Sequence, residues 1–364
     1  MSLKKDKFSK LDRFYMNLAK NLSKQNEGIT DENPSVGCVI VKNKQIISYG
    51  VTNETGRPHA ETVAINRSKQ SIKGSTVYVT LEPCSHYGKT HPCTKSLSRS
   101  KVNKVIYSIE DPDERTNNKA KSYFRSKNIK ILSGLMSNEI KQIYNKYIYS
   151  KKTKLPYVIG KIACTKNYNI FYNNTKITNS YSQAVSHLLR FKNQAIVTSY
   201  KTINTDNPEL TCRLNGLKKF SPIIIIIDRK LKVNLNKRLF KNKKNNRVII
   251  FHNSDNLKKI IKIKKKGVKL FKIKNKVNEN HFLKDILKKI YSINIYSLIV
   301  ECGKVLTEEF LKKKLFNEFY LFKGSYNQGS SKNSILNIVK KLNKNFNKKM
   351  LDTYLKNDKI IKYY

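Results

Sequence analysis

The chain reads HAETVAINRSKQSIKGSTVYVTLEPCSHYGKTHPC from residue 59 to residue 93. This stretch holds one imidazole and two thiols that Zn²⁺ can bind, and three protein ligands leave the fourth tetrahedral position open for water, as catalytic zinc sites require. Zinc lowers the pKa of such a water from about 15.7 to about 7. The carboxylate of Glu61, which is not a ligand in this pattern, can take the proton of the water and pass it on. We therefore predict a zinc site for hydrolytic deamination, with His59, Cys84 and Cys93 as metal ligands and Glu61 as the catalytic residue.

Two other interpretations of the same residues remain open. A histidine and two cysteines are often packing residues, so the three need not meet at a metal. His86 and His91 lie between the two cysteines and could compete as ligands. We interpret both as loop residues, with His86 close to the substrate.

The residues around the motif indicate an α/β domain. Residues 36–41 and 77–81 are short apolar runs rich in β-branched residues, as in buried strands. We expect helices to begin at His59 and at Cys84, each just after a strand, with their positive ends directed at the metal. Alternating strands and helices predict three layers, with helices on both faces of a sheet.

The spacing of the cysteines is unusual and points to a family. Zinc-dependent deaminases commonly have P-C-x-x-C, whereas eight residues separate Cys84 from Cys93 here. The long loop 80–93 and the upstream stretch 33–41 (NPSVGCVIV) resemble the bifunctional deaminase/reductase of riboflavin biosynthesis. From Pro156 onward, ITNS at 177–180, TDNPELTCR at 205–213 and VECG at 300–303 resemble the reductase domain of the same family, so the resemblance covers nearly the whole chain.

This resemblance implies two domains with different folds and activities. Residues 1–150 would form a three-layer cytidine-deaminase-like α/β domain, and residues 151–364 would form an α/β domain like dihydrofolate reductase. The first would use Zn²⁺ to deaminate 2,5-diamino-6-(5-phosphoribosylamino)pyrimidin-4(3H)-one. The second would use NADPH to reduce the ribosyl group, which gives 5-amino-6-(5-phosphoribitylamino)uracil.

The resemblance also implies binding residues beyond the metal ligands. The expected substrate contacts are Asn33 and Lys89 in the first domain and Arg190, Leu210, Arg213 and Glu301 in the second. The expected cofactor contacts are Ala163, Thr202, Asp206, Gly303, Lys304, Val305 and Leu306. A strand that ends at Glu301, followed by a glycine and a helix, also offers free backbone amides to a phosphate.

The second half departs from the family's usual motifs. Asp206-Asn207-Pro208 replaces Asp-Asp-Pro, Asp228-Arg229 replaces Asp-Ser, and Cys302-Gly303-Lys304-Val305 replaces Gly-Gly-Pro-Thr. An alternative is therefore a deaminase whose second domain is a non-catalytic scaffold.

Composition limits the remaining function classes. A chain of 364 residues is long enough for two cores. Its 74 Lys and Arg against 25 Asp and Glu give a net charge of +49, which raises the alternative of a nucleic-acid deaminase. The basic residues are spread along the whole chain, and Tyr87 is the only aromatic residue in the cysteine loop, although base flipping needs aromatic stacking. We therefore expect small-molecule substrates and no nucleic-acid partner.

The remaining expectations concern location and assembly. No apolar run reaches the 18 residues of a membrane span, and the first residues lack a hydrophobic signal core. We expect a cytoplasmic enzyme without a membrane partner, with reduced cysteines at positions 38, 164, 212 and 302 in or near its cores. A zinc-stabilised binding module without catalysis is a further alternative, and homo-oligomerisation is left open.

Overall fold

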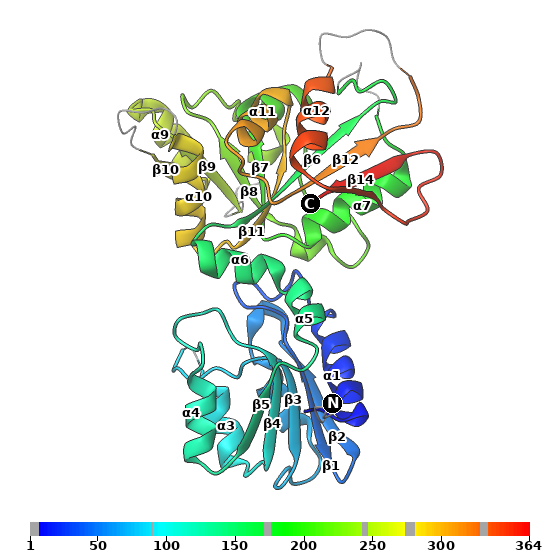
Figure 1. The fold of residues 1–364 in the computed structure, drawn as a ribbon. Helices are drawn as coiled ribbons and strands as arrows, with labels where there is room; N and C mark the ends of the chain where they lie inside the picture. The colour runs from blue at the N-terminus through cyan, green and yellow to red at the C-terminus, as the bar shows by residue number, and fades with distance from the viewer. Residues whose placement is uncertain (1–6, 89, 171–175, 242–246, 274–280, 328–333) are drawn as a thin grey trace. The chain divides into compact units, whose positions relative to one another are not determined.

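The computed structural model of the chain describes residues 7–88, 90–170, 176–241, 247–273, 281–327 and 334–364. It divides into two compact units, Met1–Thr153 and Lys154–Tyr364, each with a hydrophobic core of its own (Figure 1). No helix in the described ranges is long and apolar enough to cross a membrane.

The first unit alternates helices and strands along the chain. In order, these are α1 (Lys10–Ser23), β1 (Gly37–Lys42), β2 (Gln45–Val51), α2 (Ala60–Arg67), β3 (Thr76–Leu81), α3 (Cys93–Arg99), β4 (Lys104–Ile109), α4 (Lys119–Ser126), β5 (Lys130–Ser133), α5 (Ser137–Ile143) and α6 (Asn145–Thr153).

A five-stranded sheet in the order β2-β1-β3-β4-β5 lies at the centre of this unit. β1 pairs antiparallel with β2 and β3, whereas β3, β4 and β5 run parallel. Helix α1 packs on β1 from one side and α2 packs on β2 from the other. Gly50 permits the second contact, because a Cβ there would lie 2.2 Å from the carbonyl oxygen of Ala60. The expected three-layer arrangement is thus confirmed.

Most of the local predictions for this unit are confirmed, and one is wrong. The two predicted strands are β1 and β3, and His59 is the N-cap of α2. No helix begins at Cys84; α3 begins at Cys93, with Pro92 as its N-cap. The residue before a proline avoids helical backbone angles, so His91 and the loop before it cannot form the first turn.

The second unit has a larger sheet. Its elements are β6 (Tyr157–Cys164), α7 (Ser180–Phe191), β7 (Ala195–Ser199), α8 (Tyr200–Asp206), β8 (Ile223–Ile227), β9 (Val248–His252), α9 (Leu257–Lys264), β10 (Lys269–Lys272), α10 (Phe282–Ser292), β11 (Ser297–Glu301), α11 (Lys304–Lys312), β12 (Glu318–Lys323), α12 (Leu336–Asn345), β13 (Lys348–Met350) and β14 (Lys359–Tyr363).

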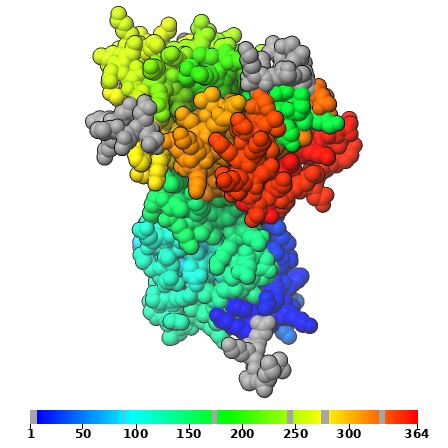
Figure 2. Space-filling view, turned by 45° about the horizontal axis from the view of Figure 1, so that its top comes forward, coloured from blue at the N-terminus to red at the C-terminus, as the bar shows by residue number. Residues whose placement is uncertain are grey.

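The nine strands follow the order β10-β9-β8-β7-β11-β6-β12-β14-β13. All neighbours from β10 to β12 run parallel, and β14 and β13 add an antiparallel edge. The run Ile223–Ile227 fits this arrangement, because a strand covered on both faces has no polar side. Helices α11 and α12 lie side by side, and their adjoining surfaces are orange and red-orange in Figure 2. The carboxyl ends of β6, β7, β8 and β11 share one edge, where ligands commonly bind in such sheets.

The other four cysteines, at positions 38, 164, 212 and 302, are buried and form no disulfide, as expected.

Candidate active sites

The three predicted zinc ligands converge in the first unit. His59 lies at the start of α2, Cys84 follows β3, and Cys93 is the first residue of α3. The Nδ1 atom of His59 lies 3.5 Å from the Sγ of Cys84 and 3.4 Å from that of Cys93, and all ligand atoms lie within 4.8 Å of one another. Tetrahedral zinc, with bonds of about 2.0 Å to nitrogen and 2.3 Å to sulfur, separates its nitrogen and sulfur ligands by about 3.5 Å. The donor set and its spacing therefore fit zinc.

The electrostatics of the cluster favour ionisation of one thiol, Cys84, whereas the hydrogen bond to Cys84, burial and Glu61 raise the pKa of the Cys93 thiol. Cys93 donates both its backbone N–H, at 3.3 Å, and its thiol to Cys84. These hydrogen bonds and His59 lower the pKa of the Cys84 thiol, so that it ionises easily. Thiolate is the form of cysteine that binds metals.

Glu61 lies in the first turn of α2, beside Cys93, and is almost completely buried. Burial raises the pKa of its carboxyl to about 7. A carboxyl with this pKa can both accept and release a proton near neutral pH, as a proton shuttle must.

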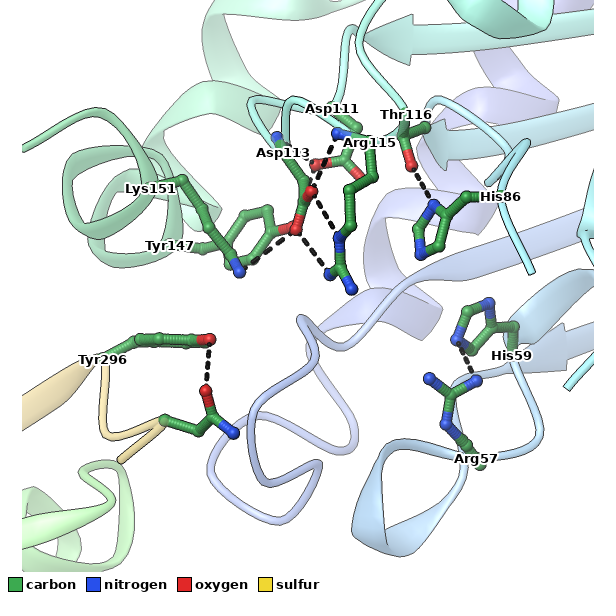
Figure 3. Close-up of polar contacts among 11 residues, drawn as sticks. Arg57, His59, His86, Asp111, Asp113, Arg115, Thr116, Tyr147, Lys151 and Tyr296 are labelled. Atoms are coloured by element: carbon green, nitrogen blue, oxygen red, sulfur yellow. Dashed lines mark hydrogen bonds and ion pairs between the residues drawn. The ribbon is translucent and has the colours of Figure 1, made fainter. Parts of the chain in front are cut away.

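The two competing histidines lie outside the cluster in the described part of the chain. His86 Nδ1 is 3.0 Å from Thr116 Oγ1 (Figure 3). His91 contacts the ring of Tyr87. Of the two expected substrate contacts in this unit, Asn33 donates from Nδ2 to the carbonyl oxygen of Gly56, three residues before His59. Lys89 lies outside the described residues.

One residue that the sequence analysis passed over organises the loop beside His86. The carboxylate of Glu82 is buried and accepts hydrogen bonds from the backbone N–H groups of Asp111, Asn118 and Ala120, at 3.0 to 3.2 Å. It thus fixes the loop that carries Thr116, the partner of His86. A glutamate directly after an apolar strand was a signal for such a role, since buried carboxylates need several donors.

In the second unit, most of the predicted residues gather around one cavity. It has a volume of about 520 Å³ and lies at the carboxyl ends of β6 and β11. Its lining includes Ala163, Arg190, Thr202, Asp206, Leu210, Glu301 and Gly303. Arg213 does not line it; its guanidinium pairs with Glu209 at 3.5 Å, and both side chains are about half exposed.

A buried ion cluster lies in the wall of this cavity. Arg190 Nε and Nη2 donate to the two carboxylate oxygens of Glu301, at 2.7 and 2.9 Å, and Lys161 Nζ lies 3.5 Å from the same carboxylate. Burial alone would raise the pKa of Glu301, but Arg190 and Lys161 lower it to about 2. Burial also lowers the pKa of Lys161. The sequence analysis missed Lys161, although a lysine inside the apolar strand β6 is itself unusual.

A second cavity, of about 400 Å³, continues from the first and shares Lys201, Thr202 and Gly303 with it. The remaining predicted cofactor contacts, Lys304, Val305 and Leu306, line it at the start of α11. Its lining includes five basic residues: Lys201, Arg229, Lys230, Lys232 and Lys304. Such a cavity suits a ligand with several phosphate groups.

The fold and the two sites define a zinc-type deaminase joined to an oxidoreductase. The pattern of the cytidine and deoxycytidylate deaminase zinc-binding region matches residues 9–109, and that of the RibD C-terminal domain matches residues 171–350. The riboflavin biosynthesis protein RibD of Aquifex aeolicus is 32% identical over 315 residues, which are 86% of each chain. The chain belongs to the RibD family, the bifunctional deaminase/reductases of riboflavin biosynthesis.

Two further relatives are similar to the first half of the chain and to the whole chain, respectively. A diaminohydroxyphosphoribosylamino-pyrimidine deaminase of Buchnera aphidicola is 47% identical over 146 residues, which are 40% of this chain and 99% of the relative. The structure of Acinetobacter baumannii RibD superposes with a TM-score of 0.85 at 26% identity and covers 97% of this chain and 98% of its own. The expected cytidine-deaminase-like and dihydrofolate-reductase-like folds are thereby confirmed.

Proposed function

We propose that residues 1–150 deaminate 2,5-diamino-6-(5-phosphoribosylamino)pyrimidin-4(3H)-one, and that residues 151–364 then reduce the ribosyl group of the product with NADPH. The observation that carries the first step is the convergence of His59, Cys84 and Cys93 beside the buried Glu61. The substrate is that named for the Buchnera deaminase, which resembles this half of the chain over its full length.

His59, Cys84 and Cys93 would hold Zn²⁺ in the first domain, with Asn33 and Lys89 at the substrate. Bound zinc supplies a water that loses its proton near neutral pH. Glu61 would accept this proton and pass it to a ring nitrogen. It would then carry a second proton, from the hydroxyl group added to the ring carbon, to the amino group, which leaves as ammonia. Its pKa of about 7 supports both transfers.

In the second domain, Arg190, Leu210, Arg213 and Glu301 would bind the substrate. NADPH would lie along Ala163, Thr202, Asp206 and the start of α11, from Gly303 to Leu306, and supplies a hydride to the sugar carbon. Reduction of a carbonyl or imine also consumes a proton. Lys161, which shares the carboxylate of Glu301 in the cavity wall, is placed to donate it.

The cations of the second cavity support NADPH over NADH. Lys230 and Lys232 follow β8 and line the same cavity as the N-terminus of α11. NADPH carries one more phosphate than NADH, and lysine is a common partner of phosphate. We expect Lys230→Ala with Lys232→Ala to raise the KM for NADPH about tenfold and to leave the KM for NADH nearly unchanged. Lys258→Ala, on the exposed side of α9, is the matched control.

The deaminase is tested with Glu61→Gln in the full chain. The loss of a general base costs about 10²- to 10⁴-fold in rate. We expect ammonia release to fall by this factor while the protein retains one zinc per chain. A variant that deaminates at the normal rate would point to a zinc-stabilised binding module instead.

The reductase is tested separately by adding the deaminated intermediate and NADPH and following absorbance at 340 nm. Oxidation that requires both compounds is the expected result. No oxidation above background, with normal deamination, would identify the second domain as a scaffold. The alternative that the protein is a nucleic-acid deaminase predicts deamination of single-stranded DNA or RNA, which we do not expect.

A further inference from the structure

Arg57 lies at the edge of the zinc-ligand cluster and has donors to spare. Its Nη1 donates to Thr90 Oγ1 at 2.8 Å and lies 3.3 Å from His59 Nε2 (Figure 3). Within the described ranges, no carboxylate forms an ion pair with Arg57. A guanidinium has five N–H groups in a planar fork, and one hydroxyl uses a single one of them. The half-buried Arg57 therefore suits an anion that is not part of the chain.

The free side of this guanidinium shares a small space with His86. A Cβ at Gly88 would lie 3.5 Å from Arg57 Nη2 and 3.9 Å from His86 Nε2. Both nitrogens thus face the same point over Gly88, and the glycine leaves that point empty of side-chain atoms. His86 is held in this orientation from its other nitrogen, Nδ1, by Thr116.

Arg115 adds a second guanidinium beside His86. Its Nε and Nη2 donate to the carboxylate of Asp113, at 2.9 and 2.8 Å, and Lys151 Nζ lies 3.2 Å from the same carboxylate. One carboxylate is therefore shared by two cations, Arg115 and Lys151. Arg115 and His86 lie close enough to interact electrostatically (Figure 3).

We propose that Arg57, assisted by Arg115, binds the phosphate group of the deaminase substrate and thereby positions the pyrimidine at the metal cluster. The inference rests on the proposed function, because the phosphate belongs to the phosphoribosyl group of that substrate. A planar fork of donors matches two phosphate oxygens at once, which a lysine cannot do. The cluster His59–Cys84–Cys93 lies directly beside Arg57, so a phosphate held there is tethered next to the reacting ring.

The test compares two substrates on the zinc-loaded full chain: the phosphate ester and the same compound without its phosphate. A hydrogen bond between charged groups is commonly worth a tenfold to hundredfold change in affinity. We expect Arg57→Ala to raise the KM for the phosphate ester at least tenfold more than the KM for the dephosphorylated compound. Arg57→Lys should recover part of this difference, and Arg115→Ala should show a smaller loss of the same kind. Arg67→Ala, in the last turn of α2, is the matched control and should change neither KM.

Equal losses for both compounds, or a fall in zinc content, would overturn the proposal, because they would mean that Arg57 only supports His59. If the wild-type chain deaminates neither compound, the proposed function fails. A binding measurement then still decides whether Arg57 binds a phosphate group. Calorimetry with ribose 5-phosphate should then show binding to the wild type that is weakened at least tenfold by Arg57→Ala. Both proteins keep the cavity of the second unit, so their difference reports only on Arg57. Two results would contradict a site for a small phosphate ester: binding that Arg57→Ala leaves unchanged, or a single-stranded oligonucleotide that binds at the same site more tightly than ribose 5-phosphate.

Discussion

Glu301 is buried between the guanidinium of Arg190 and the ammonium of Lys161, and these three side chains are each less than 15% exposed. Charges removed from water are stable only when they compensate one another. With two cations around one carboxylate, the cluster keeps a positive charge, which the cavity beside it can offer to an anionic substrate. The cluster therefore has a structural role, and it would also attract the anionic substrate of the proposed reaction.

We expect Glu301→Gln to destabilise the second unit by roughly 3–5 kcal/mol, because it leaves two buried cations without a counter-charge. Urea unfolding of the full chain measures the effect, and NADPH oxidation measures the activity, which should be lost. Glu209→Gln is the matched control, since its half-exposed pair with Arg213 should contribute less than about 1 kcal/mol. Adding Lys161→Met to Glu301→Gln should restore part of the stability and none of the activity. Equal stability of Glu301→Gln and Glu209→Gln would contradict this account.

Asp111 provides a pH-dependent test in the first unit. Burial raises the pKa of its carboxyl from 3.8 to about 6 in the folded protein. Because the folded state holds this proton more tightly than the unfolded state does, the carboxyl costs stability as the pH rises from about 4 to about 6. Asp111→Asn removes the titration and keeps an oxygen acceptor for Tyr147 and the backbone of Asp113.

The unfolding free energy of Asp111→Asn relative to wild type should therefore increase across this pH range, by up to roughly 2–3 kcal/mol, and stay constant above it. Urea unfolding at a series of pH values from 4 to 8 gives the difference directly. A difference that does not vary with pH would mean that Asp111 has an ordinary pKa.

At the scale of residues, the sequence predicted the role of a side chain where the chemistry requires one type of residue. It did not predict the role where this depends only on which atoms the fold brings together. Histidine and cysteine at fixed spacings predicted the ligand cluster, because few other side chains bind zinc. Arg57 and Glu82 carry no such constraint on type, and their roles follow from Thr90, Gly88 and three backbone amides that only the folded chain brings to them.

At the scale of elements, the position of α2 against β2 determines where His59 and Glu61 lie. The helix approaches the strand at Gly50, and Ser48, on the same strand, donates to the carbonyl oxygen of Ala64 at 2.5 Å. A Cβ at Gly50 would also lie 2.6 Å from the backbone nitrogen of Ala64. Backbone atoms cannot move aside as a flexible side chain can, so the whole helix would have to shift.

We expect Gly50→Ala to displace α2 and thereby lower both zinc content and ammonia release by tenfold or more, because small displacements of reacting groups are costly. Ser48→Ala, two residues away, removes one hydrogen bond without a clash and should keep most of the activity. Metal analysis and an ammonia assay on both variants provide the comparison. Full zinc content and activity in Gly50→Ala would show that the helix tolerates the shift.

Elements were predictable where the hydrophobic pattern is strong. The runs at β1, β3 and β8 are apolar and β-branched, so their burial as strands was clear from composition. The start of α3 was not, because it depends on Pro92 and on the hydrogen bond from the Thr94 N–H to the Cys84 carbonyl oxygen. Hydrophobic periodicity contains no information on such contacts.

At the scale of the whole molecule, two hydrophobic cores lie in two compact units, and the three candidate metal ligands all belong to the first. Only that unit should depend on zinc for its stability. A ligand present at 1,000 times its dissociation constant stabilises the folded state by about 4 kcal/mol. For a unit of this size, this raises the Tm by about 10 °C.

Removal of zinc by a chelator should therefore lower the melting temperature of the first unit by this amount and leave that of the second unchanged. Calorimetry of the full chain with and without chelator separates the two melting transitions. NADPH, which would bind only the second unit, should raise the melting temperature of that unit and not that of the first. Cys93→Ser in the presence of zinc should reproduce most of the effect of the chelator, because it removes one of the three candidate ligands. Cys38→Ser leaves all three in place and should remain sensitive to chelation. If the chelator shifts both transitions equally, the units do not unfold independently; if it shifts neither, the cluster does not hold a metal that stabilises the fold.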